Sequence, residues 1–201
     1  MSLERPAPRQ RGVTLVEALV ALIIVSIGVL ALSALQIVSK RNTLDAAMHS
    51  DAASLAHNLL ERMRGNASID ALNSYLNAAV LGLGDGQMAD GAVCAPDNPC
   101  SPQQLASQDL REWEALLDGQ QERIGALADG TATGGLDDGR ACLQGPNGGV
   151  SGLYTLTIAW RGSVPLPDDP TAPDCGRGLG LYGDGEALRR VLQLQTFIAA
   201  R

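Results

Sequence analysis

Aromatic side chains are scarce in this sequence of 201 residues, where Phe, Trp and Tyr make up 3% against 23 glycines. Large rings supply much of the buried area of a domain core, so their scarcity predicts a thin core with long loops. An excess of basic residues is also missing, since the formal charge is −7 and the sequence pI is about 4.7. Phosphate binding needs a basic face, so this balance argues against nucleic acid as the main partner.

Histidine is nearly absent, with His49 and His57 as the only two. Both fall in a segment whose pattern predicts a structural helix, where solvated or packing roles are expected. Ser-His-Asp and Cys-His catalysis need a histidine that reaches the nucleophile. Acidic pairs such as Asp137-Asp138 lie in glycine- or proline-rich loops, where solvated charge is the expected role. The sequence therefore predicts no enzymatic activity, no cofactor and no metal.

One long segment has no charged residue at all, the run from Ala18 to Val38. A run this long and this apolar predicts a membrane-spanning helix, and it exceeds the apolar region of a cleaved secretory signal. Glu17 nevertheless falls within the first turn or two of this helix. An ionisable group in hydrocarbon costs about 2.5–3.5 kcal/mol, so this carboxylate requires a partner.

The first twelve residues are basic, with Arg5, Arg9 and Arg11 against Glu4. Pro6 and Pro8 keep this segment extended. A short basic stretch before an apolar run stays in the cytoplasm by the positive-inside rule.

Residues 12–17, Gly-Val-Thr-Leu-Val-Glu, resemble the prepilin motif of type IV pilins, usually written G-F-T-L-x-E. The sequence departs from it at Val13, where phenylalanine is usual. The resemblance implies that a membrane prepilin peptidase cuts between Gly12 and Val13 and methylates the new N-terminus of Val13. It also implies that Glu17 pairs with the N-terminal amine of a neighbouring subunit, so that the partner of the carboxylate arrives on assembly.

A second helical pattern follows the apolar run. No proline falls between residues 13 and 65, which predicts one continuous helix about 80 Å long at 1.5 Å per residue, with a stop at Gly65-Asn66. Apolar residues recur along its second half at steps of three, four and seven: Leu44, Met48, Ala52, Leu55, Leu59 and Met63.

Residues 55–66, LAHNLLERMRGN, and residues 21–30 are similar to minor pilins of the PilV type. The resemblance implies a subunit that primes or initiates type IV pilus assembly and supports twitching motility and adhesion. Its partners would be the prepilin peptidase, other minor pilins, the major pilin, the inner membrane and a large tip adhesin. The precursor would cross the inner membrane once, with leader 1–12 in the cytoplasm, a transmembrane half 13–38 and a periplasmic head 39–201. It would then reach the pilus tip at the cell surface.

Three alternatives share parts of this pattern. A minor pseudopilin of a type II secretion system has the same leader, helix and tip role, and residues 55–66 favour the pilus over it. A major pilin fits less well, because the chain has four cysteines and none after Cys175. The third is a membrane-anchored periplasmic binding domain that never polymerises. A DNA-uptake role is opposed by the acidic balance.

The rest of the chain predicts two short helices followed by strands. Helical spacing occurs at residues 69–80 and 103–117, and Trp113 is expected to anchor the core. The acidic residues of the second helix, Asp109, Glu112 and Glu114 among them, are expected off the apolar face. Alternating patterns predict strands at residues 152–160 and 190–198, with a shorter one around 141–143. In the first of these, Thr155 and Thr157 are expected to point away from the apolar face. Strands without intervening helices indicate an α+β fold, in which a small antiparallel sheet packs on the C-terminal half of the long helix.

The four cysteines are Cys94, Cys100, Cys142 and Cys175. Five residues separate the first two, and prolines with an Asp-Asn pair force a turn between them. A zinc site needs closer cysteine pairs or histidines. Because the head of the pilin family lies outside the cytoplasm, the resemblance favours a local Cys94–Cys100 disulfide and leaves Cys142 for Cys175. Four cysteines allow three connectivities, and the sequence alone does not decide between them.

Overall fold

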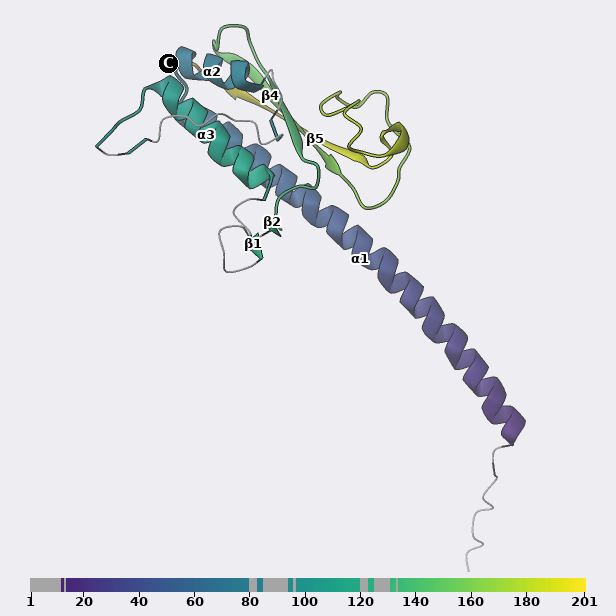
Figure 1. The fold of residues 1–201 in the computed structure, drawn as a ribbon. Coiled ribbons are helices and arrows are strands. Elements are labelled where there is room, and N and C mark those ends of the chain that lie inside the picture. Colours follow the sequence, from purple (N-terminus) through teal and green to yellow (C-terminus); the bar gives the residue numbers. More distant parts are fainter. Residues whose placement is uncertain are drawn as a thin grey trace, which may run out of the picture. The chain divides into compact units, whose positions relative to one another are not determined.

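A computed structural model of the chain describes residues 12, 14–79, 83–84, 94–95, 97–119, 123–124, 131–132 and 134–201. The chain divides into two units, Met1–Thr43 and Leu44–Arg201, and the boundary falls within the long helix α1, Leu15–Gly65 (Figure 1). In the first unit every side chain of residues 15–43 is exposed. By length and composition, α1 is able to cross a membrane.

The second unit begins with the rest of α1 and two shorter helices, α2 (Ile69–Ala79) and α3 (Pro102–Leu117). Helix α3 begins where its sequence provides a cap: the Ser101 hydroxyl accepts from the Gln104 amide at 3.3 Å, and the Gln104 side chain accepts from the Ser101 amide at 2.9 Å. Pro102 occupies the first turn, where its missing N–H costs nothing. Ser68 caps α2 in a similar way, since its hydroxyl accepts from the Ala71 amide at 3.2 Å.

A three-stranded antiparallel sheet completes this unit, with the order β3-β4-β5. Its strands are β3 (Arg140–Gln144), β4 (Gly152–Arg161) and β5 (Arg189–Ile198). A two-residue pair, β1 (Arg123–Ile124) with β2 (Thr131–Ala132), and a short 3-10 helix η1 (Asp184–Glu186) lie outside it. The expected α+β fold, with its long N-terminal helix and small antiparallel sheet, is confirmed.

The core lies between the sheet and the helices of this unit. Trp113 on α3 and Trp160 on β4 are its largest buried side chains, and Trp113 Nε1 donates to the Leu55 carbonyl of α1 at 2.8 Å. From α1 the core takes one side of the last four turns: Ala52, Ala56, Leu59, Leu60 and Met63. The expected stripe therefore begins later than predicted, because Leu44 is 48% exposed.

Two further expectations about side chains need correction. Thr155 and Thr157 point away from the core as predicted, yet both are buried, because Gln195 donates to the Thr155 hydroxyl at 3.0 Å and Cys175 lies against Thr157. Glu114 does not face solvent but is 3% exposed. Its carboxylate accepts from the Gly84 amide at 2.7 Å, so it satisfies a backbone donor that enters the core from another segment.

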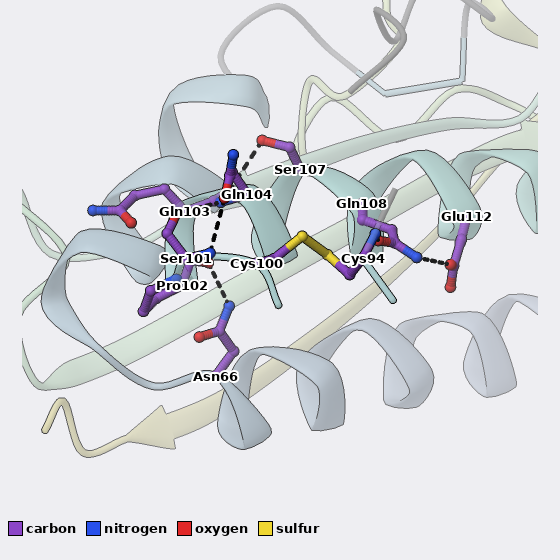
Figure 2. The surroundings of a disulfide bond; sticks show 10 residues. All are labelled: Asn66, Cys94, Cys100, Ser101, Pro102, Gln103, Gln104, Ser107, Gln108 and Glu112. Atoms are coloured by element: carbon purple, nitrogen blue, oxygen red, sulfur yellow. Dashed lines mark hydrogen bonds between the residues drawn. A yellow bond between two sulfur atoms is a disulfide. The ribbon is translucent and has the colours of Figure 1, made fainter. Parts of the chain in front are cut away.

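Two disulfides hold the loops of this unit. Cys142 on β3 is joined to Cys175 in the connection before β5, and Cys94 is joined to Cys100. Figure 2 shows the second bond beside α3, where the Cys94 amide donates to Gln108 Oε1 at 2.7 Å. This connectivity is the one favoured in the sequence analysis. A disulfide that closes a longer loop removes more entropy from the unfolded chain, so Cys142–Cys175, with a sequence separation of 33, is the more stabilising of the two.

Candidate functional site

The first turn of α1 is built around Thr14. Its hydroxyl accepts from the Glu17 amide at 3.3 Å, and its carbonyl accepts from the Ala18 amide at 3.1 Å. These contacts are those of an N-cap, which supplies a partner to an amide that would otherwise have none. Thr14 therefore fixes the start of α1 three residues before Glu17.

Gly12 precedes this cap and is exposed, with no atom within 4 Å of the position that a Cβ would occupy. No described atom therefore crowds Gly12. Val13 and residues 1–11 lie outside the described residues, so Gly12 is the only described residue of the expected leader, and the expected methylation site lies outside the described residues.

Glu17 lies in the first turn of α1, where the partial positive charge of the helix N-terminus favours a carboxylate. Its side chain is exposed, and in the described part of the chain no residue forms an ion pair with it. Its neighbours along the helix are apolar and also exposed: Leu15, Val16, Leu19 and Val20. Within the described residues, Glu17 is therefore a carboxylate without an ion-pair partner on a locally apolar surface.

Two other polar groups of this surface, both serine hydroxyls, are satisfied within the helix. Ser26 Oγ donates to the Leu22 carbonyl at 2.7 Å, and Ser33 Oγ donates to the Val29 carbonyl at 2.9 Å. In hydrocarbon such internal bonds replace those with water. The two serines are therefore compatible with lipid, whereas the Glu17 carboxylate has no ion-pair partner among the described residues.

A partly buried charged cluster lies between three helices of the second unit. Arg62 on α1 donates to Asp109 and Glu112 of α3, each at 2.9 Å, and Tyr75 on α2 donates its hydroxyl proton to Asp109. Burial raises the pKa of Tyr75, and its hydrogen bond to Asp109 raises that pKa further. A hydrogen bond from Gln108 and the neighbouring Arg62 lower the pKa of Glu112. The cluster thus joins α1, α2 and α3 through charged and hydrogen-bonded side chains.

The remaining sequence-identified residues do not assemble into a chemical site. All four cysteines are in disulfides, and the ring of His49 lies 5.8 Å from that of Trp160. In the described ranges no three His, Cys, Asp or Glu side chains come together as metal ligands. Glu114 is the buried carboxylate that the sequence analysis missed, because its partner Gly84 is 30 residues away in the chain.

Two family models match consecutive parts of the chain. The model described as prokaryotic N-terminal methylation motif matches residues 7–33, and the model described as type IV pilin Tt1218 matches residues 34–111. The first covers Gly12, Glu17 and most of the apolar run. The second covers the rest of α1, α2 and most of α3. No curated protein and no solved structure matches the chain.

Proposed function

This chain belongs to the type IV pilin superfamily, and we propose that it is a minor pilin that primes or initiates the assembly of a type IV pilus. The observation that carries the proposal is the exposed, apolar start of α1 with Glu17 as its one carboxylate. Pilins are generally structural subunits. In this proposal the chain is the substrate of cleavage and methylation, and the prepilin peptidase catalyses both reactions. The similarity of residues 55–66 to PilV-type sequences supports the minor role.

Processing would change both the charge and the first residue of the chain. The leader 1–12 has three arginines and one glutamate, a net charge of +2, so its removal changes the formal charge from −7 to −9. Cleavage after Gly12 would also create an amine at Val13, which the peptidase methylates. In a bundle of such chains the amine of one subunit can meet Glu17 of another. The ion pair then replaces solvation of both groups, and its geometry sets the axial position of each incoming subunit.

The division of labour along the chain follows from this proposal. Residues 13–38 would lie in the inner membrane of the precursor and then in the core of the filament. Residues 39–201 would form a periplasmic head that faces the other minor pilins, the major pilin and a tip adhesin. At the pilus tip the subunit would support twitching motility and adhesion.

We predict that the mature chain begins with N-methyl-Val13. This prediction is supported by Gly12, which is exposed and precedes the helix cap at Thr14. Intact-mass and N-terminal peptide mass spectrometry of the chain from its own membranes measures this directly. An intact Met1 or Ser2 on the assembled chain contradicts the pilin processing route and favours a permanently anchored domain.

Deletion of the gene should remove surface pili and twitching while leaving protein secretion intact. A minor subunit that initiates assembly acts before the bulk of the filament forms, so its loss reduces pilus number rather than pilus length. Electron microscopy of sheared filaments, together with assay of secreted enzymes in the same cells, separates the two systems. A secretion defect with normal pili would assign the chain to a type II secretion pseudopilus.

A further inference from the structure

Strand β5 is an edge of the sheet, since β4 is its only neighbouring strand among the described residues. The Gly162 amide donates to the Leu188 carbonyl at 2.7 Å, whereas the Arg161 amide turns away from β5 to the Asp137 carbonyl at 2.8 Å. Together with the register of β4 and β5, these bonds fix which backbone groups face outward, because facing pairs alternate along an antiparallel ladder. The following residues direct both N–H and C=O to the open edge: Val191, Gln193, Gln195 and Phe197.

This edge lacks the features that usually prevent strands from pairing. Edge strands in soluble proteins are commonly short, bulged, or interrupted by charged residues and proline. Strand β5 has ten residues, all paired with β4 in unbroken register. Residues 191–200, VLQLQTFIAA, contain no charged residue, no proline and no glycine. Its backbone is therefore an open template for one more strand.

Apolar side chains on both faces of the edge are incompletely covered. On the inner face, Leu192 and Leu194 pack against the core but remain only partly buried. On the outer face, Phe197 and its cross-strand partner Leu153 are each 61% exposed. A strand beside β5 would place alternate side chains over both pairs, so addition of a strand would bury apolar surface as well as satisfy the backbone.

The charge around the edge favours one kind of occupant. Residues 187–201 contain Arg189, Arg190 and Arg201 and no acidic residue, although the whole chain has a charge of −7. Two arginines near β5 are balanced by carboxylates, since Arg64 of α1, which also donates to the Thr196 hydroxyl, is paired with Glu61, and Arg190 lies 3.9 Å from Asp45. The excess of positive charge beside β5 therefore rests on Arg189 and Arg201, which have no ion pair among the described residues. A second copy of β5 would bring arginines toward arginines, whereas an acidic strand is complementary.

We propose that the open edge of β5, residues 191–197, binds an extended acidic segment of a partner protein by β-strand addition. Main-chain hydrogen bonds would supply affinity, and alternate side chains would supply specificity. The inference rests on the proposed role as a pilus subunit, in which the head needs a specific surface for its neighbour. It names that surface and the chemistry of the segment that occupies it.

The test places a photoreactive residue at the edge of the full-length chain in its own host, as Phe197→p-benzoylphenylalanine, and compares Gln195→Pro with Gln195→Ala in that background. Both substitutions remove the side-chain bond to Thr155, but only proline removes the outward N–H, and proline is tolerated at such edge positions. We expect an adduct with a different protein through an acidic extended segment. Its yield should fall about tenfold in Gln195→Pro relative to Gln195→Ala, the effect of losing one hydrogen bond with local distortion.

A charge pair at the same position keeps the test decisive if the proline variant does not fold. Gln195→Glu should reduce adduct yield, and Gln195→Lys should maintain or raise it. The proposal would be overturned if the adduct yield were equal in Gln195→Pro and Gln195→Ala and also equal in Gln195→Glu and Gln195→Lys. Adducts formed only between two copies of β5 would overturn it as well. Sheared filaments from the same cells separate it from the pilus role. If Gln195→Pro gives the same adduct yield as Gln195→Ala and the filaments are normal, the proposal for the edge is wrong and the pilus role stands. If the adduct depends on the edge but deletion of the gene leaves pili unaffected, the pilus role is wrong and the edge proposal stands.

Discussion

Glu17→Lys should reduce incorporation of this chain into sheared filaments by roughly 10²-fold or more and leave cleavage after Gly12 largely intact. Removing one partner of a buried ion pair costs about 3–5 kcal/mol, and each 1.4 kcal/mol is about tenfold in an equilibrium. Lysine also places a second positive charge beside the amine of the neighbouring subunit. Glu17→Ala removes only the attraction, so its effect should be the smaller of the two.

Three matched variants separate charge from helix structure. Glu17→Gln keeps the shape without the charge, and Glu17→Asp keeps the charge on a shorter side chain. Thr14→Ala removes the cap bond to the Glu17 amide and should cost about 1 kcal/mol of helix stability, with a much weaker effect on assembly. Immunoblots of sheared filaments against the membrane pool give incorporation, and mass spectrometry gives cleavage. Normal incorporation of both the alanine and lysine variants would remove the pairing role.

The elements of this fold were predictable where they depend on local pattern. The long apolar run, the absence of proline between residues 13 and 65, and the alternation at residues 152–160 each predict one element. The observed α1, β4 and β5 agree with these expectations within two residues. Helix α3 was predictable to within one residue. Its last four apolar residues follow a helical spacing of three, three and one: Leu110, Trp113, Leu116 and Leu117.

The errors concern contacts between distant segments. The sequence pattern predicts Glu114 as a surface carboxylate. Its burial is explained by a hydrogen bond from the amide of Gly84, which belongs to another part of the chain. Thr155 and Thr157 read as solvent-facing until Cys175 and the glutamines of β5 cover them. In each case the burial of the side chain depends on which distant segment packs against it. The residue pattern along a single segment does not predict that contact.

The candidate site divides in the same way. Gly12 and Glu17 stand out in the sequence because a cleavage motif is local and a carboxylate beside an apolar run is conspicuous. Their roles in cleavage and pairing stay predictions. The open edge of β5 was not identifiable, because the strand order and the direction of each amide follow from tertiary pairing. The sequence of residues 191–200 acquires its meaning only once β5 is known to lie at the edge.

Trp113→Ala should be among the most destabilising single substitutions in the second unit, at about 3–5 kcal/mol. Trp113 is fully buried and joins α3 to α1 through its Nε1 bond to the Leu55 carbonyl at 2.8 Å. Truncation to alanine leaves a cavity at this junction and removes the bond. The urea dependence of protease susceptibility, measured on the processed chain in detergent, reports the change.

Trp160 provides a matched control that separates packing from hydrogen bonding. It is as deeply buried as Trp113, but its Nε1 has no hydrogen-bond partner among the described residues. Tryptophan to phenylalanine removes similar volume at both sites, yet only at Trp113 does it break a hydrogen bond, which is worth about 1 kcal/mol. At Trp160 the same change removes a buried donor that has no partner. Trp113→Phe should therefore cost about 1 kcal/mol more than Trp160→Phe, and an equal or reversed order would show that the indole bond to Leu55 does not hold α3 on α1.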